Sequence, residues 1–253
     1  MKVLLLGDLH CRRDWFAWLL TQTPSWDLIA MPGDLLDCFG EEYPLQQRAV
    51  TIWLDELAGR GRPVAWCSGN HDQGRWTFVG ENAEERPCWT DQLQGSAIVG
   101  DLETNSILVQ GRPLLVSCLP YSDLRTERFE SRIGTLLADA AAERTTLGCP
   151  WIVLSHVPPS ELSLSKGLRK DLGDPVLRYY VEKYRPDIVL SGHVHEAPFH
   201  GPFCERIGST ACFNAGFVPD ASFPCHVVLD LATRKAIFHY ERENRIQCEE
   251  ASF

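Results

Sequence analysis

Residues 186–195 read Pro-Asp-Ile-Val-Leu-Ser-Gly-His-Val-His and carry the clearest structural signal in the chain. Residues 187–190 are apolar and rich in β-branched side chains after the initial aspartate, with proline before them and Ser-Gly after them. This pattern predicts a buried strand that ends at a loop. His193 and His195 follow the strand directly, at the place where open α/β sheets bind their ligands. Two imidazoles do not complete a catalytic metal site, so we expect oxygen ligands at the ends of other strands.

The first third of the chain repeats the order strand, polar loop and helix, which predicts parallel strands joined by helical crossovers. Later in the chain, a hairpin is expected around residues 111–112. The apolar patterns predict strands at residues 2–6, 27–31, 63–68, 97–100, 106–110, 113–119, 151–155, 187–190, 211–214, 225–230 and 235–241. They predict helices at residues 15–22, 45–57, 133–144 and 175–184.

The sequence predicts a single domain over residues 1–253, because it contains no linker, repeat or low-complexity tract. Residues 73–96 are mixed and charged, and we interpret them as an irregular insertion. Residues 158–174 are expected to form a loop, and the polar residues after about 242 a loose tail.

The composition is that of an ordinary globular protein, but its charge is informative. The formal net charge of −10 argues against general nucleic-acid binding and against binding to anionic membranes, since neither partner favours an acidic surface. Residues 3–6 are too short for the core of a signal peptide, and no apolar run approaches the roughly 18 residues of a membrane span. We therefore expect a soluble protein.

Ten cysteines raise the question of disulfides or structural zinc. No two of them lie closer than eight residues, so no Cys-x-x-Cys motif of a zinc ribbon or thioredoxin-like site occurs. Several, such as Cys67 and Cys118, interrupt apolar runs and are expected to be buried thiols. A reduced, cytoplasmic protein is the expectation that follows.

Side chains that bind metals follow five of the expected strands. Each alone has an ordinary explanation: Asp34 could cap a helix, and Asn70 could lie in a turn. Their occurrence at the same end of five strands favours a shared metal site. The candidate ligands are Asp8, His10, Asp34, Asn70, His156, His193 and His195.

The chemistry of these ligands indicates the kind of metal centre. Carboxylates, imidazoles and an amide oxygen without a thiolate suit Mn²⁺ or iron, and also Zn²⁺, in a site that is not structural. Seven ligands are too many for one ion and suit two divalent ions that share a bridging group. Only Asp8 and Asp34 would be ionised, so the ions would keep a net positive charge and attract an anionic substrate such as a phosphate ester.

These motifs resemble those of the calcineurin-like metallophosphoesterase family, most closely its small bacterial phosphodiesterase-type members. Asp-x-His, Gly-Asp-x-x-Asp, Gly-Asn-His-Asp, a later histidine and Gly-His-x-His stand in the family's order at residues 8–10, 33–37, 69–72, 156 and 192–195. The resemblance covers most of the chain. It implies an α/β fold, a four-layer sandwich of two mixed β-sheets flanked by helices, with a dimetal site at the carboxyl ends of the strands.

The resemblance also implies a distribution of ligands over the two metal ions, with Asp34 and a water or hydroxide bridging them. One ion would be held by Asp8, His10, Asp34 and His195. The other would be held by Asp34, Asn70, His156 and His193.

The resemblance implies roles for three residues around the ligands and shows two departures from the family. His71 would be the acid or transition-state stabiliser near the leaving oxygen, whereas Asp37 and Asp72 would orient ligands or cap loops. Ser155 stands where the family usually has glycine. Cys38 stands where many relatives carry an arginine or asparagine, which argues against a protein phosphatase.

The expected reaction is hydrolysis of a phosphate ester, by preference a phosphodiester, through attack of a metal-bridged hydroxide on phosphorus. A phosphomonoesterase, a protein phosphatase or a non-catalytic protein-binding scaffold on the same fold are the alternatives. A nucleotide or another small phosphate ester is the expected partner, and the oligomeric state is open. Arg12, Lys166 and Arg169 are candidate substrate contacts, although a solvated surface position is an alternative for each. Trp76 and Trp89 could wall the pocket or pack within the insertion.

Overall fold

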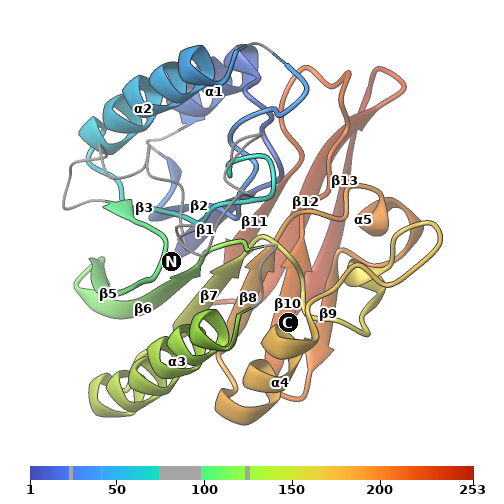
Figure 1. Cartoon of the computed structure of the whole chain (residues 1–253). Coiled ribbons are helices and arrows are strands. Elements are labelled where there is room, and N and C mark those ends of the chain that lie inside the picture. The colour runs from blue at the N-terminus through green and yellow to red at the C-terminus, as the bar shows by residue number, and fades with distance from the viewer. Residues whose placement is uncertain (23–24, 41, 74–97, 123–125) are drawn as a thin grey trace.

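The computed structural model describes residues 1–22, 25–40, 42–73, 98–122 and 126–253. In these residues, a seven-stranded and a six-stranded sheet pack face to face (Figure 1). Helices cover the outer face of each sheet, so that the fold has four layers. The expected α/β sandwich with two mixed sheets is confirmed.

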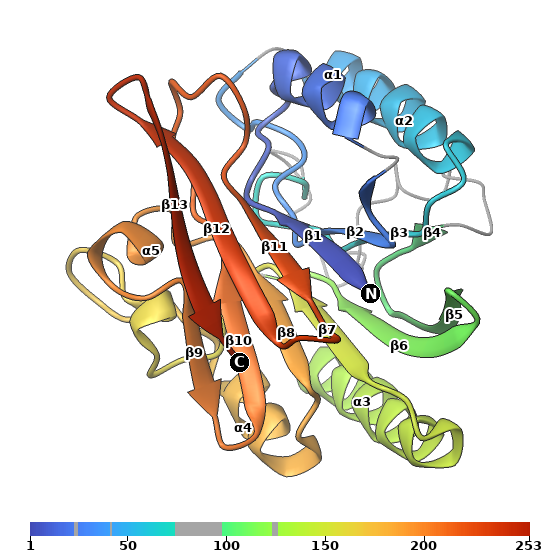
Figure 2. The same cartoon turned by 180° about the vertical axis from the view of Figure 1, so that it is seen from behind.

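The seven-stranded sheet has the strand order β13-β12-β11-β1-β2-β3-β4. Its strands β1 to β4 pair in parallel, whereas β11, β12 and β13 add antiparallel strands at one side (Figure 2). The strands are β1 (Lys2–Leu6), β2 (Leu28–Met31), β3 (Val64–Trp66), β4 (Ile98–Val99), β11 (His226–Asp230), β12 (Lys235–Arg242) and β13 (Arg245–Ser252).

The six-stranded sheet has the order β5-β6-β7-β8-β10-β9. Strands β6, β7, β8 and β10 are parallel, and the antiparallel strands β5 and β9 form its two edges. The strands are β5 (Glu103–Val109), β6 (Arg112–Leu119), β7 (Trp151–Ser155), β8 (Ile188–Ser191), β9 (Cys204–Ile207) and β10 (Thr210–Asn214).

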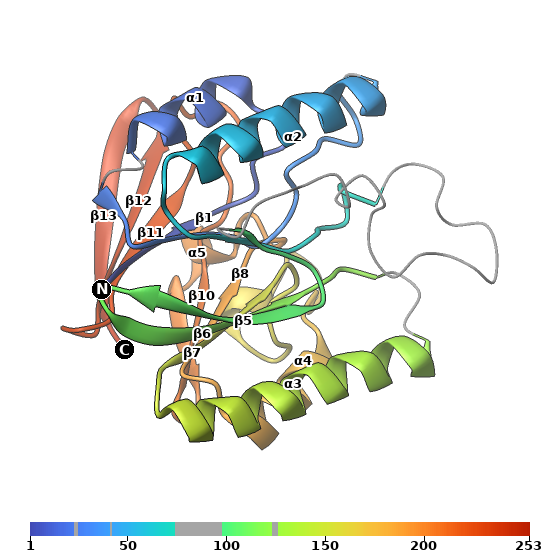
Figure 3. The ribbon, with the colours of Figure 1, turned by 90° about the vertical axis from the view of Figure 1, so that its left-hand side faces the viewer.

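Two helices lie over each sheet, as Figure 3 shows. The seven-stranded sheet is covered by α1 (Arg13–Gln22) and α2 (Tyr43–Gly59), and the six-stranded sheet by α3 (Glu127–Leu147) and α4 (Pro175–Tyr184). A short helix α5 (Ala197–His200) and a 3₁₀ turn η3 (Ser163–Ser165) complete the helical elements of the described residues. No helix in this part of the chain is long and apolar enough to cross a lipid bilayer.

Several element boundaries differ from the sequence expectation for local reasons. Helix α3 begins a turn and a half earlier than residue 133, because the Thr126 hydroxyl accepts a hydrogen bond from the Phe129 N–H at 3.1 Å. It ends where Gly148 takes a φ of 59°. The hairpin turns at Gln110 and Gly111, with φ values of 51° and 75°, one residue earlier than expected.

The central strands are buried on both faces. In β1, Val3 and Leu5 face the other sheet, and Leu4 and Leu6 face the helices α1 and α2. Strand β7 alternates in the same way between the core shared by the sheets and the layer of α3 and α4. Because the core between the sheets draws side chains from both, the carboxyl ends of their strands are held at a fixed separation.

The chain after residue 242 is a strand, so the expected loose tail is wrong. Strand β13 pairs with β12 in continuous antiparallel register. The next residue, Phe253, is 6% exposed and packs edge-on against Phe213, with ring centroids 5.2 Å apart. Backbone pairing and the buried Phe253 ring stabilise the strand, although its sequence is polar. The expected insertion at residues 73–96 lies outside the described residues, apart from Gln73.

Replacing Phe253 by alanine should therefore lower the free energy of unfolding by about 3 kcal/mol, the usual cost of removing a buried phenyl ring. Ile246→Ala on β13 is the matched control, because Ile246 is 73% exposed and its loss should change stability little. Urea unfolding of both variants measures the difference. Equal, small effects would mean that this part of the chain contributes no anchoring.

Candidate metal centre

The candidate ligands come from loops that follow five strands of two different sheets. The strands β1, β2 and β3 belong to one sheet, and β7 and β8 belong to the other. The parallel strands end at the same edge of each sheet, and the sheets pack face to face, so the five loops meet there. All seven candidate ligands lie in these loops.

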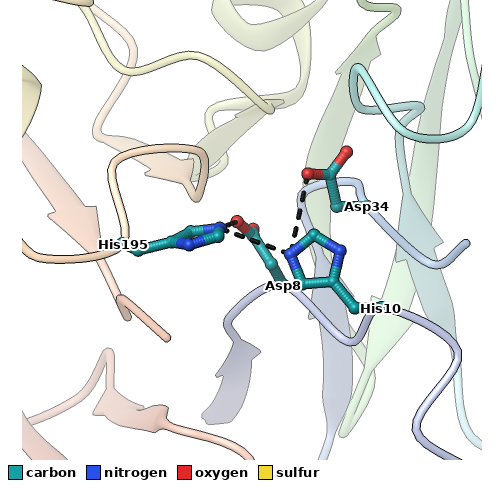
Figure 4. Close-up of side chains that lie close together, drawn as sticks. All are labelled: Asp8, His10, Asp34 and His195. Atoms are coloured by element: carbon teal, nitrogen blue, oxygen red, sulfur yellow. Dashed lines mark hydrogen bonds and ion pairs between the residues drawn. The ribbon is translucent and has the colours of Figure 1, made fainter. Parts of the chain in front are cut away.

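Four of these side chains form a first cluster (Figure 4). His195 Nε2 lies 2.8 Å from Asp8 Oδ2 and 3.3 Å from His10 Nε2. Asp34 Oδ2 lies 4.0 Å from His10 Nε2. Each residue offers one ligand atom, and these atoms all lie within 4.8 Å of one another. This spacing is suitable for one metal ion.

The remaining candidates form a second cluster beside the first. Asn70 Oδ1 lies 2.8 Å from His156 Nε2 and 2.9 Å from His193 Nδ1, and the two nitrogen atoms are 3.2 Å apart. Asp34 Oδ1 lies 3.4 Å from His156 Nε2. The two carboxylate oxygens of Asp34 therefore face different clusters, which is the arrangement of a bridging ligand.

The protonation of His156 shows that the second cluster suits a cation. Its Nδ1–H donates to the carbonyl oxygen of Pro32 at 2.8 Å, which leaves a lone pair on Nε2. Complete burial lowers the pKa of His156 to about 3, so the ring stays neutral. Its Nε2 lone pair thus faces Asn70 Oδ1, which is also an acceptor. A metal ion between these two atoms would satisfy both.

The first cluster is short of positive charge. Burial, together with the neighbouring carboxylates of Asp8 and Asp72, raises the pKa of Asp34 well above its usual range. Burial would also raise the pKa of Asp8, but the hydrogen bond from His195 and the surrounding imidazoles outweigh it and lower that pKa. Burial lowers the pKa of His10 to about 4 and keeps it neutral. A bound divalent cation would therefore stabilise the ionised form of Asp34.

Three candidate ligands have a left-handed backbone conformation that is rare outside glycine. The φ values are 43° at His10, 50° at Asp34 and 67° at His193. The Asp34 carbonyl accepts hydrogen bonds from the N–H groups of Leu9 and His10 at 3.0 and 2.9 Å. The His193 N–H donates to the Asp8 carboxylate at 3.2 Å. Such strained residues concentrate at functional sites, where surrounding contacts hold them in place.

Two motif glycines are required by close approach to the carboxylates. A Cβ atom on Gly69 would overlap Asp34 Oδ1, and a Cβ atom on Gly192 would overlap Asp8 Oδ1. Any side chain at these positions would displace a candidate ligand. The glycines of the Gly-Asn-His-Asp and Gly-His-x-His motifs thus have a steric function in the centre.

His71 lies beside the first cluster with a defined tautomer. Its Nδ1 accepts the Cys38 N–H at 3.1 Å, so the neutral ring carries its proton on Nε2, which lies 3.9 Å from Asp34 Oδ2. Burial lowers the pKa of His71, which favours this neutral form, whereas Asp37 Oδ1, 3.6 Å from Nδ1, opposes the shift. His71 therefore presents an N–H donor to the cluster.

Side-chain exposure differs across the centre. It is 0% at His156, 12% at His71 and 36% at His195. Solvent therefore reaches the centre at His195 and, to a smaller extent, at His71.

Asp72 and Asp37 support the loops that carry the ligands. Asp72 accepts hydrogen bonds from the N–H groups of Leu36 and Gly69 at 2.9 and 2.8 Å, which joins the loops after β2 and β3. The Asp37 backbone forms two hydrogen bonds with the buried Gln46 of α2, at 2.7 and 2.8 Å. Sequence reasoning missed Gln46, because a glutamine within a helix carries no signal of such a contact.

Arg12, a candidate substrate contact, is engaged within the protein. Its guanidinium donates to the Asp14 carboxylate at 2.7 Å and to the carbonyl oxygens of Pro219 and Ala221. It also lies 4.5 Å above the ring of Trp15. These contacts favour a structural role for Arg12.

The other proposed contacts are not brought to the centre. Lys166 and Arg169 are exposed on the loop of residues 158–174. Among the described residues, no hydrogen bond or ion pair joins either side chain to a candidate ligand. Trp76 and Trp89 lie outside the described residues.

Phe217 is a further neighbour of the ligands that sequence reasoning missed. Its ring centroid lies 4.8 Å from that of His10 and 4.7 Å from that of His195. It follows β10, which carries no candidate ligand, so no pattern in the sequence places it here. The Phe217 ring packs against both imidazoles and restricts their rotation on that side.

Gly69→Ala should lower the affinity for Mn²⁺ at least about tenfold, because the added methyl group displaces Asp34. Gly59→Ala is the matched control, since a Cβ at that position would meet no atom within 4 Å. Calorimetric titration with Mn²⁺ measures both. Unchanged affinity and stoichiometry in Gly69→Ala would contradict the steric argument.

Comparisons with known proteins identify the family of the chain. The family model described as Calcineurin-like phosphoesterase matches residues 1–197. A search of curated proteins gave no match.

Several solved structures share the fold. A dimetal phosphatase from Danio rerio has a TM-score of 0.61 and 12% identity, over 94% of this chain and 95% of that one. The protein TT1561 of Thermus thermophilus has a TM-score of 0.58 and 16% identity, over 98% and 97%. The purple acid phosphatase PPD1 from yellow lupin seeds has a TM-score of 0.57 and 16% identity, over 100% and 53%. The family match covers most of the sequence, and the chain belongs to the calcineurin-like phosphoesterase family.

Proposed function

We propose that this chain is a binuclear metal-dependent hydrolase of phosphate esters whose preferred substrate is a phosphodiester. The observation that carries the proposal is the pair of ligand clusters that share Asp34. In this proposal, one ion is held by Asp8, His10, Asp34 and His195, and the other by Asp34, Asn70, His156 and His193. Mixed oxygen and imidazole ligands favour Mn²⁺ or iron, with Zn²⁺ as the third candidate.

Bound divalent ions supply Lewis acidity and lower the pKa of a coordinated water toward neutrality. In this proposal, the chain itself contributes a hydrogen-bond donor beside the ligand clusters. The Nε2–H of His71 would donate to the leaving oxygen and stabilise its developing charge. The Cys38 N–H donates to Nδ1 and so fixes the tautomer that carries the proton on Nε2.

The charge of the centre favours a diester over a monoester. Two divalent ions would be offset by the ligand carboxylates of Asp8 and Asp34 and by Asp37 beside His71. With the bridging hydroxide counted as well, the centre would be close to neutral, which suits the single negative charge of a phosphodiester better than the two charges of a monoester. The guanidinium of Arg12, which could otherwise bind a monoester, is engaged with Asp14.

The expected small substrate and reducing location are part of the proposal. Solvent reaches the centre at His195 and, to a smaller extent, at His71, and we propose that a nucleotide or another small phosphate ester enters there. All cysteines among the described residues are free thiols, which supports a cytoplasmic location.

His71→Ala should lower kcat at least about 100-fold while leaving metal content unchanged, because it removes the donor to the leaving oxygen but no ligand. His200→Ala is the matched control, since it removes an exposed imidazole outside the centre. Steady-state kinetics and elemental analysis measure the two quantities. Undiminished turnover in His71→Ala would show that the assigned role is wrong.

The reaction class is tested with bis-p-nitrophenyl phosphate and p-nitrophenyl phosphate after chelation and reconstitution with Mn²⁺, iron or Zn²⁺. We expect turnover that depends on added metal and a higher kcat/KM for the diester. A higher kcat/KM for the monoester would favour the phosphomonoesterase alternative. Neither metal binding nor turnover would favour a non-catalytic scaffold.

A further inference from the structure

Asn214, the last residue of β10, is a completely buried polar side chain next to the metal centre. Its amide Nδ2 donates to the carbonyl oxygens of Val194 at 3.0 Å and Leu164 at 3.3 Å. Its Oδ1 accepts the N–H of Gly216 at 2.8 Å. One side chain therefore joins three separate segments of backbone.

The bond to the Val194 carbonyl acts on the ligand positions, because Val194 lies between His193 and His195. These two imidazoles belong to different clusters, so the carbonyl between them sets the spacing of both. The same segment after β10 holds the loop a second time, since the Phe217 N–H donates to the His195 carbonyl at 3.2 Å. The loop of residues 192–195 is thus held from behind by β10 and the residues that follow it.

We propose that Asn214 is a positioning residue for the dimetal centre: its amide holds the loop of residues 192–195 in the geometry that both metal ions require. The inference rests on the proposed metal-binding roles of His193 and His195. Asn214 itself offers no atom to a metal, because all its polar atoms are engaged with backbone.

The chemistry of the position requires an amide. Val194 and Leu164 present acceptors and Gly216 presents a donor, so the buried side chain must donate twice and accept once. Aspartate would supply only acceptors and would bury a charge. Alanine would remove the hydrogen-bond partner of the Leu164 carbonyl and of the Gly216 N–H, and would leave the Val194 carbonyl with the Ala197 N–H at 3.3 Å alone, which loosens the segments that these groups belong to.

The bond to Leu164 extends this support to the loop of residues 158–174. Leu164 is completely buried in η3, and its N–H donates to Glu205 of β9 at 3.2 Å. A Cβ atom on Gly201, directly after α5, would lie 3.3 Å from the Ser163 side chain, so η3 also packs behind the helix that follows His195. The loop of residues 158–174 therefore supports the loop of residues 192–195 through Asn214.

The test compares Asn214→Ala with Thr210→Val. Thr210 lies on the same strand, is equally buried, and donates from Oγ1 to the Pro186 carbonyl at 2.6 Å, at the opposite end of β8. Both variants remove buried hydrogen bonds to backbone next to β8, and both should lower the Tm. Only Asn214→Ala should raise the Kd for Mn²⁺, by about tenfold or more, in calorimetric titration of the folded protein.

Wild-type Mn²⁺ affinity and stoichiometry in folded Asn214→Ala would overturn the inference, as would an equal loss of affinity in Thr210→Val. If Asn214→Ala does not fold, Asn214→Ser is titrated instead, with the same two outcomes and a loss of affinity again expected. The proposed function fails separately: a wild-type protein that binds two Mn²⁺ ions without hydrolysing either p-nitrophenyl ester would refute it. Metal titration of Asn214→Ala would still decide the positioning role.

Discussion

The rest of this structure depends on one constraint. Hydrogen-bond acceptor atoms converge in a buried space, and the protein places too little positive charge between them. His156 Nε2 faces Asn70 Oδ1 at 2.8 Å, and Asp34 lies buried among other carboxylates. Such a group is costly unless cations lie between its members. Its members come from both sheets, so the centre exists only because the shared core holds the strand ends at a fixed separation. The His193 N–H, which donates to Asp8, joins the sheets directly across this edge.

The loops that carry the ligands are held in strained conformations by buried polar groups from behind. Left-handed residues such as His10 and Asp34 cost about 1–3 kcal/mol each, so they need supporting contacts. Asp72 joins the loops after β2 and β3, Gln46 of α2 holds Asp37, and Asn214 of β10 holds the loop after β8. Each supporting side chain bonds to backbone, which fixes the direction of a ligand without using a coordination position. The metal ligands and the groups that orient them are therefore separate sets of residues.

The parts of this structure that were predictable from sequence are those with a local signal. Strands β1, β7 and β8 were recognisable because strands buried on both faces read as continuous apolar runs, and the ligands follow them directly. Strand β13 was not recognisable, because its sequence is polar. It is held by pairing with β12 and by the buried ring of Phe253, and neither contact leaves a signal in the local sequence. The same applies to the supporting groups Gln46 and Asn214, and to Arg12, whose partners include carbonyl oxygens about 200 residues away along the chain.

The central claim is that two metal ions share Asp34. It is tested most directly by the anomalous diffraction of crystals grown with Mn²⁺. We predict two peaks about 3.5–4 Å apart, one bordered by His10 and His195 and the other by His156 and His193. A single peak, or two peaks of which only one contacts Asp34, would contradict the account.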